Sequence, residues 1–148
     1  MKSLKYAVIG GGSWATAIVK ILCENLSEIS WYMRNQTTIE HIKKYKNNPN
    51  YISSVEFPIE KLKLTNDINE AVAVADVLIF VVPSAFLVSE LQKLTHSLEG
   101  KIIFSAIKGI VPESGLVVGE HFMKYYSVPI ENMGVITGPC HAEEVALE

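Results

Sequence analysis

The sequence has few cysteines, no excess of positive charge and no long hydrophobic run, and each of these absences excludes a class of protein. Its two cysteines, Cys23 and Cys140, lie far apart without metal-ligand or CxxC spacing, which excludes a disulfide scaffold and predicts free thiols in a reducing compartment. Thirteen Lys and Arg residues against sixteen Asp and Glu residues give a formal charge of -3. We therefore expect neither nucleic acid nor an anionic membrane surface as a partner.

An export signal, a metal-binding pattern and room for a second domain are missing as well. The apolar stretch at residues 6–9 is too short for a signal-peptide core or a membrane span, so we expect a cytoplasmic protein. The four histidines show no ligand spacing, and we predict no metal site; they are His41, His96, His121 and His141. With 148 residues the chain has the length of one ordinary domain.

The sequence does contain a regular alternation of short apolar runs with segments of helical periodicity. This alternation continues without a Pro/Gly-rich linker and predicts one α/β domain over residues 1–148, a doubly wound, mainly parallel sheet with helices on both faces. Near-continuous apolar strands are typical of a sheet that is covered on both faces. The predicted strands are residues 6–9, 29–33, 62–65, 77–82, 102–105 and 134–137.

Hydrophobic spacing and capping patterns predict the first helices. Ile18, Leu22 and Leu26 recur every fourth residue, which places them on one face of a helix that packs on the sheet. Residues 37–40 have the regular capping-box pattern, Thr-x-x-Glu, and residues 67–70 have a similar pattern with Asp in the first position. Both patterns predict that a helix begins there.

Another helix is predicted after the fourth strand. Ser84 would cap it, and the helix would run from Ala85 to about Leu98. Gly100 would end it, because glycine readily adopts the left-handed conformation that stops a helix. Residues 47–50, Asn-Asn-Pro-Asn, predict a loop.

A glycine-rich turn at residues 10–15, Gly-Gly-Gly-Ser-Trp-Ala, follows the first predicted strand and opens the first helix. This is the context of the G-x-G-x-x-G/A fingerprint of the Rossmann fold, which binds NAD or NADP. Gly10 would allow the tight turn, and Gly12 would let the backbone approach a pyrophosphate, while Ala15 keeps the helix close to the strand. The alternative is a merely flexible turn, but the position at the start of a βαβ unit favours a dinucleotide site held by the helix N-terminus.

The end of the second strand bears on the choice between NAD and NADP. In NAD-specific folds an Asp or Glu about twenty residues after the glycines binds the adenosine ribose. No carboxylate stands in residues 31–35, and Arg34 offers a bidentate donor suited to a 2′-phosphate. Arg34 is alternatively a solvated charge at a strand end. We predict that the cofactor is NAD(P), with NADP slightly favoured.

Five stretches agree with one known family: residues 10–14 (Gly-Gly-Gly-Ser-Trp), Trp31 with Arg34, residues 48–51 (Asn-Pro-Asn-Tyr), residues 82–84 (Val-Pro-Ser), and residues 108–110 (Lys-Gly-Ile) with 138–145 (Gly-Pro-Cys-His-Ala-Glu-Glu-Val). Over nearly its whole length the chain resembles the bacterial type of NAD(P)-dependent glycerol-3-phosphate dehydrogenase. The resemblance implies an oxidoreductase that transfers a hydride between NAD(P)H and dihydroxyacetone phosphate or sn-glycerol 3-phosphate. Its product would supply phospholipid biosynthesis.

The resemblance also implies roles for single residues. Cofactor contacts are expected at Gly10, Gly12, Ser13, Trp14, Arg34, Phe86, Lys108 and Ala142. Substrate contacts are expected at Lys108, Gly138 and Cys140. Cys140 stands where many relatives have Ser or Thr, which puts a side-chain contact from this weaker donor in doubt.

Lys108 is the catalytic candidate within these 148 residues. It follows the strand at 102–105, at the carboxyl end of a parallel sheet, where ligands bind in such folds. Its ammonium group would neutralise a phosphate or polarise the ketone as hydride arrives. A solvated loop lysine is the alternative. Phe86 is equally explained as a core residue at the start of a helix.

The family has a helical C-terminal domain that contributes the lysine acting as general acid and base, and this domain is absent from the chain. The sequence stops in what is expected to be the first turns of a helix, so we take it as the cofactor-binding part of a longer enzyme, inactive by itself. Apolar surface facing the missing domain would be exposed, which favours self-association, for instance as a homodimer.

Two other functions stay open from the sequence. The glycine turn and a two-domain plan are shared with ketopantoate reductases and other 2-hydroxyacid-type dehydrogenases, although these differ around Lys108 and Gly138. A nucleotide-sensing domain without catalysis is the second alternative.

Overall fold

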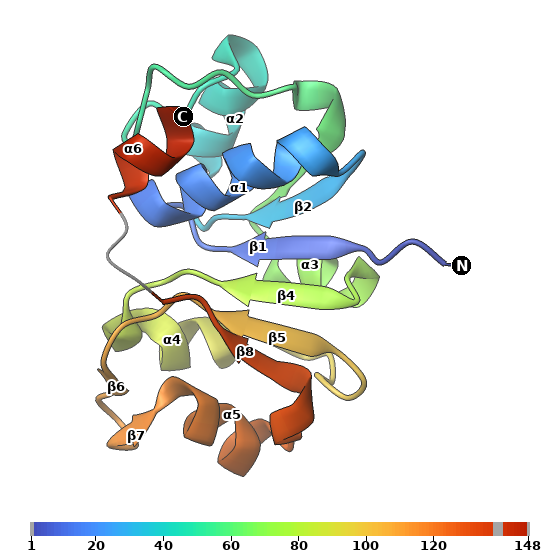
Figure 1. Ribbon diagram of the computed structural model, residues 1–148, viewed down its shortest axis with the longest axis vertical. Coiled ribbons are helices and arrows are strands. Elements are labelled where there is room, and N and C mark those ends of the chain that lie inside the picture. Colours follow the sequence, from blue (N-terminus) through green and yellow to red (C-terminus); the bar gives the residue numbers. More distant parts are fainter. Residues whose placement is uncertain (1, 138–140, 148) are drawn as a thin grey trace.

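The computed structural model describes residues 2–137 and 141–147, and its centre is a six-stranded sheet in which every strand pair is parallel. Its strands are β1 (Tyr6–Ile9), β2 (Ile29–Tyr32), β3 (Leu62–Thr65), β4 (Val77–Phe80), β5 (Ile102–Ser105) and β8 (Met133–Val135). They lie in the order β3-β2-β1-β4-β5-β8 (Figure 1). This order is that of the doubly wound Rossmann fold, so the predicted fold class is confirmed.

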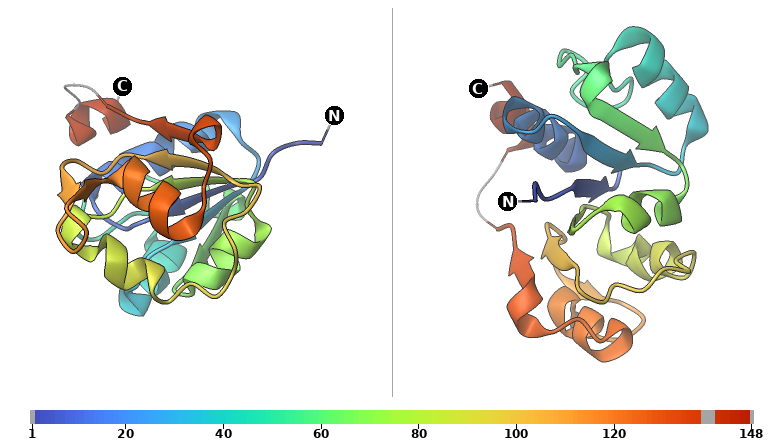
Figure 2. Two further views of the ribbon diagram at one scale, coloured as in Figure 1. Left: turned by 90° about the horizontal axis from the view of Figure 1, so that it is seen from below. Right: turned by 90° about the vertical axis from the view of Figure 1, so that its right-hand side faces the viewer.

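Helices cover the two faces of the sheet (Figure 2). They are α1 (Ser13–Asn25), α2 (Gln36–Tyr45), α3 (Ile68–Val74), α4 (Ser84–Leu91), α5 (Val118–Tyr126) and α6 (Ala142–Leu147), with short 3-10 turns at Ile59–Lys61 and Ile130–Asn132. Residues of α3, α4 and α5 pack into one buried cluster, and residues of α1, α2 and α6 pack into another. Neighbouring strand residues alternate between the clusters, as Val8 and Ile9 do, because successive side chains point to opposite faces. Figure 1 shows α6 beside α1.

The strands at 6–9, 62–65 and 102–105 have the predicted bounds, whereas three others differ at their ends. β2 and β4 end earlier than predicted. One residue beyond each strand, a last backbone hydrogen bond joins it to its neighbour: Met33 N–H donates to the Thr65 carbonyl and Val81 N–H to the Ile9 carbonyl. There the chain leaves the sheet to form the candidate site described below. A small antiparallel hairpin of β6 (Ile110–Val111) and β7 (Leu116–Val117) was not predicted, because two-residue strands carry no readable periodicity.

The prediction for α4 was wrong at both ends. Ser84 is the first helical residue and Pro83 precedes it as N-cap, so Ser84 does not cap the helix. The helix ends at Leu91 instead of about Leu98. Asn69 of α3 explains the early end, because its side chain donates to the Lys93 carbonyl at 3.0 Å and accepts from the Thr95 N–H at 2.7 Å. These bonds hold the backbone of residues 93–95 in a non-helical path.

The two predicted capping boxes differ in outcome. Asp67 caps α3 as predicted, since its carboxylate accepts a hydrogen bond from the Asn69 N–H at 2.9 Å. The box at residues 37–40 was wrong, because α2 begins at Gln36 and is capped by Asn35. The Asn35 side chain accepts from the amides of residues 37 and 38, at 2.9 and 3.3 Å, and thereby moves the helix start toward the N-terminus.

Apolar side chains are exposed on the β5–β8 side of the sheet, and whether this is the surface that would face a further domain stays a prediction. Phe104 of β5 is 36% exposed and Val135 of β8 is 65% exposed, and Ile130 in the turn before β8 is 69% exposed. Self-association through such a surface stays a prediction.

Candidate functional site

Two cavities open where the strand order reverses between β1 and β4, at the carboxyl ends of these strands. This is the place at which doubly wound sheets bind their ligands. The first cavity, of about 340 Å³, is lined by the glycine turn, the end of β2 and the start of α4. The second, of about 920 Å³, is lined by the start of α1, the loop after β5 and the start of α6. Both share Gly12, Val81, Val82 and Pro83.

The fold requires glycine at one position of the turn but not at another. Gly10 has φ +137°, and a Cβ there would lie 2.0 Å from the Val81 carbonyl oxygen, so this position tolerates no side chain. A Cβ at Gly12 would meet no protein atom within 4 Å, so the protein itself does not require glycine there. Gly12 is the N-cap of α1, and no side chain caps the first amides of that helix. The space and the free donors fit an anionic group such as a pyrophosphate.

Three side chains fix the carbonyls of residues 10–12. The indole N–H of Trp31 donates to the first carbonyl at 2.7 Å, and the amide of Asn48 donates to the second at 3.3 Å. The hydroxyl of Thr16, one turn into α1, donates to the third at 2.7 Å. Because three successive carbonyls are bound by buried or part-buried donors of the protein, the turn is held in one conformation before any ligand binds.

Asn48 contacts this turn from the loop at residues 47–50, a role that the sequence did not predict. It is fully buried, it also donates to the Thr16 hydroxyl at 3.0 Å, and its side-chain oxygen accepts from the Asn50 N–H at 3.0 Å. Residues 47–50 form a loop, as predicted. The motif at 48–51 was the available signal, but it did not reveal that the loop folds back against the glycine turn.

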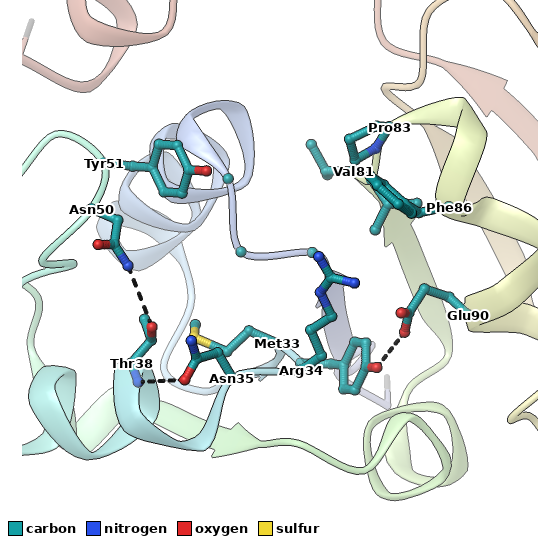
Figure 3. A pocket seen from close by; sticks show the side chains of 15 residues that line it. Met33, Arg34, Asn35, Thr38, Asn50, Tyr51, Val81, Pro83, Phe86 and Glu90 are labelled. Carbon is teal, nitrogen blue, oxygen red and sulfur yellow. Dashed lines mark hydrogen bonds between the residues drawn. The ribbon is translucent and has the colours of Figure 1, made fainter.

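The first cavity brings Arg34 and Phe86 together (Figure 3). Arg34 follows β2 and Phe86 lies in the first turn of α4, and the guanidinium carbon lies 5.2 Å from the centre of the phenyl ring. This is a cation–π contact. Both side chains are exposed, with Phe86 at 44%, so Phe86 is not an ordinary core residue. Their predicted contacts with the cofactor stay predictions.

A buried polar pair lies deeper in the same wall. The Tyr32 hydroxyl at the end of β2 donates a hydrogen bond to the carboxylate of Glu90 on α4, and the Lys93 ammonium lies 2.9 Å from the other carboxylate oxygen. Burial, with the hydrogen bond to Glu90, raises the pKa of the Tyr32 hydroxyl, so this group stays a neutral donor. Sequence analysis missed Glu90, because a glutamate inside a helix is usually solvated.

The second cavity brings together five predicted residues from three parts of the chain. Its lining includes Gly12, Ser13 and Trp14 at the start of α1, Lys108 after β5, and Ala142 at the start of α6. Lys108 is exposed and is followed by Gly109 with φ +84°. The ammonium group therefore adds a positive charge to a cavity that also has the N-terminus of α1 in its wall, an arrangement suited to a phosphorylated ligand.

Some predictions concern other parts of the chain. Gly138 and Cys140 lie outside the described residues, so their predicted substrate contacts stay predictions. Within residues 2–137 and 141–147, no three His, Cys, Asp or Glu side chains gather as metal ligands would. In the same part of the chain, no helix has the length and apolar character needed to cross a membrane.

Comparison with known proteins agrees with this arrangement. The family described as NAD-dependent glycerol-3-phosphate dehydrogenase N-terminus matches residues 5–148. The chain belongs to this family. Glycerol-3-phosphate dehydrogenase [NAD(P)+] of Macrococcus caseolyticus is 32% identical over 147 residues, which are 98% of this chain and 44% of the relative. The Bacillus subtilis protein of that name is 32% identical over 145 residues, 97% of this chain and 42% of its own. The chain thus spans less than half the length of these relatives.

Solved structures of the family have the same fold. Glycerol-3-phosphate dehydrogenase from Coxiella burnetii superposes with a TM-score of 0.81 at 25% identity, covering 98% of this chain and 44% of that one. The Plasmodium falciparum enzyme has a TM-score of 0.86 at 24% identity, covering 97% of this chain and 43% of that one. At this level of identity the second likeness supports the fold alone.

Proposed function

We propose that the chain is an NAD(P)-binding domain whose two cavities together accommodate one dinucleotide. The observation that carries this proposal is the glycine turn, whose carbonyls are fixed by three side chains and whose Gly12 leaves open space before the amides of α1. A turn preorganised in this way binds a pyrophosphate without the entropic cost of ordering itself. The family name of the relatives supports the same cofactor.

The residues would divide the dinucleotide between them. Gly10 and Gly12 would shape the pyrophosphate site, together with backbone donors at Ser13. In the first cavity Arg34 and Phe86 would hold the adenosine part. In the second cavity Trp14, Ala142 and Lys108 would line the space for the nicotinamide part.

We further propose that the domain belongs to a glycerol-3-phosphate dehydrogenase acting on dihydroxyacetone phosphate and sn-glycerol 3-phosphate for phospholipid biosynthesis. The cofactor would supply the hydride. Lys108 would neutralise the substrate phosphate or polarise the ketone, and Gly138 and Cys140 would contact the substrate. A helical C-terminal domain, absent from these 148 residues, would supply the lysine that moves the proton on the substrate oxygen.

We also propose that the domain slightly favours NADP. Arg34 stands where an NAD-specific fold would place a carboxylate, and it is exposed beside the first cavity, where a 2′-phosphate would find it. Phe86 holds the guanidinium from one side and leaves its N–H groups for an anion.

Calorimetric titration of the chain with NADPH and NADH tests the cofactor proposal. We expect both to bind, NADPH somewhat more tightly. Arg34→Ala should weaken NADPH binding about tenfold more than NADH binding, since one charge-assisted contact is worth about 1.5 kcal/mol or more. Lys44→Ala, which removes an exposed cation from α2, is the matched control. No binding of either dinucleotide would overturn the proposal, and a clear NADH preference would overturn the NADP part.

Catalytic turnover by these 148 residues alone is tested separately. With NADPH and dihydroxyacetone phosphate we expect no measurable turnover, because the proposal assigns the acid-base lysine to a helical C-terminal domain. Oxidation of NADPH that depends on dihydroxyacetone phosphate would contradict this expectation.

A further inference from the structure

Two neighbouring side-chain contacts join the end of β2 to the helix α4. Tyr32 is the last residue of β2, and Arg34 follows two residues later. Phe86 and Glu90 lie one turn apart on α4. One contact is the hydrogen bond that Tyr32 donates to Glu90, and the other is the cation–π contact of the Arg34 guanidinium with the ring of Phe86. All four residues line the first cavity, and Figure 3 labels Arg34, Phe86 and Glu90 among them.

A negative charge therefore lies in the same wall as the cation expected to bind a 2′-phosphate. Glu90 is only 3% exposed, and its carboxylate forms an ion pair with Lys93. Burial and the bond to Glu90 raise the pKa of Tyr32, while the Arg34 guanidinium opposes part of that rise. The charge of Arg34 thus acts on the Tyr32 hydroxyl, and this hydroxyl donates to Glu90, which lines the same cavity as Arg34.

Packing alone does not require a carboxylate at position 90. A glutamine has nearly the same shape, and its amide oxygen accepts the hydrogen bond from Tyr32 equally well. What a carboxylate adds is one negative charge in the wall of the first cavity, together with an ion pair to Lys93. The charge at position 90 therefore acts both on Lys93 and on the first cavity, and the ion pair with the half-exposed Lys93 offsets only part of it.

We propose that Glu90 is a specificity-determining residue that limits the preference for NADP and keeps NADH as an accepted cofactor. This inference rests on the proposed function of the first cavity. The Glu90 charge opposes the two negative charges of a 2′-phosphate, whereas a ribose with a free 2′-hydroxyl is neutral and is little affected. Arg34 and Glu90 thus act in opposite directions on the same substituent of the cofactor.

The test compares the affinities of the chain for NADPH and NADH in Glu90→Gln by calorimetry. We expect the ratio of the two dissociation constants to shift three- to tenfold toward NADPH, mostly through tighter NADPH binding. Adenosine 2′,5′-bisphosphate and AMP, which differ only in the 2′-phosphate, should show a shift of the same size. Glu131→Gln removes the same charge from an exposed position in the turn before β8 and should leave both ratios unchanged.

A second variant decides the case if Glu90→Gln does not fold. Lys93 is half-exposed, and Lys93→Gln removes the cation that offsets Glu90. This variant should shift the ratio toward NADH. Unchanged ratios in a folded, cofactor-binding Glu90→Gln protein, or a shift toward NADH, would overturn the proposal, and so would an unchanged ratio in Lys93→Gln. Failure of the unchanged chain to bind either dinucleotide would instead overturn the proposed function, and this inference with it.

Discussion

The two cavities differ in how deeply the groups that line them are buried in the described part of the chain. The first is small, about 340 Å³, and its walls contain the buried pair of Tyr32 and Glu90 and the glycine turn that Asn48 fixes. The second is larger, about 920 Å³, and two of the groups that give it chemistry, Ser13 and Lys108, are exposed. The first cavity, which we propose holds the adenosine half, is therefore lined by buried groups of this fold, whereas the second cavity presents exposed groups.

This contrast separates two kinds of site residue. In the first cavity, a change to a buried residue that holds the turn should affect folding and binding together. In the second cavity, a change to an exposed residue should affect binding alone. The three predictions below test this division, beginning with the largest effect.

The glycines of the turn should give the largest effect. Gly10→Ala should lower the free energy of unfolding by about 3 kcal/mol or more, because the new Cβ would clash with the Val81 carbonyl at a φ that alanine avoids. Gly12→Ala is the matched variant, because its Cβ meets no protein atom. It should fold normally in thermal melts but bind NADPH about tenfold more weakly, since the Cβ would obstruct the pyrophosphate. Equal stability of the two variants would contradict this account of the turn.

Asn48→Ala should give an intermediate effect on both properties. It would leave the Gly11 carbonyl and the Thr16 hydroxyl without this donor, which costs about 1–3 kcal/mol of unfolding free energy in urea titrations. NADPH affinity should fall as well, because the turn would lose one of its fixed carbonyls. Asn25→Ala, at the exposed end of α1, should change neither property measurably. If Asn48→Ala loses stability and retains full affinity, then Asn48 is structural only.

Lys108→Ala should give the smallest effect in the chain by itself. Because Lys108 is exposed, the free energy of unfolding should change by less than about 0.5 kcal/mol. NADPH affinity should fall about threefold, since an exposed ionic contact contributes less than about 1 kcal/mol. Lys124→Ala on α5 is the control, with no change expected in calorimetric affinity. A large loss of unfolding free energy in Lys108→Ala would show that residues of the second cavity, like those of the first, contribute to the stability of the fold.

Sequence patterns predicted the fold class well because the signals were local and repeated. The strand at 6–9 is buried on both faces, and its apolar run with the glycines that follow is a pattern few other structures produce. Helix ends were predicted less well. Asn35 caps α2 two residues before the predicted start, and Asn69 captures the backbone after α4 through a contact distant in sequence. Such side-chain contacts compete with helix continuation and leave no periodicity.

The candidate site was predicted in part for a similar reason. Arg34 was found because it stands where an NAD-specific fold has a carboxylate, and Lys108 because the resemblance to the family marks it at the carboxyl end of a predicted strand. Asn48 and Glu90 were missed because their roles come from long-range contacts, with Thr16 and Tyr32 respectively. The local sequence around an asparagine or a glutamate does not indicate whether its side chain is buried against a polar partner or solvated.

The most direct test of the central claim is amide chemical-shift mapping of the chain during titration with NADPH. We expect the largest changes at residues 11–14, in the turn between the two cavities, and at 34–35 in the first cavity, with smaller changes at 107–109 in the second. Unchanged glycine-turn amides, or the largest changes on α5 and the β6–β7 hairpin, would contradict the claim that the dinucleotide binds where the strand order reverses.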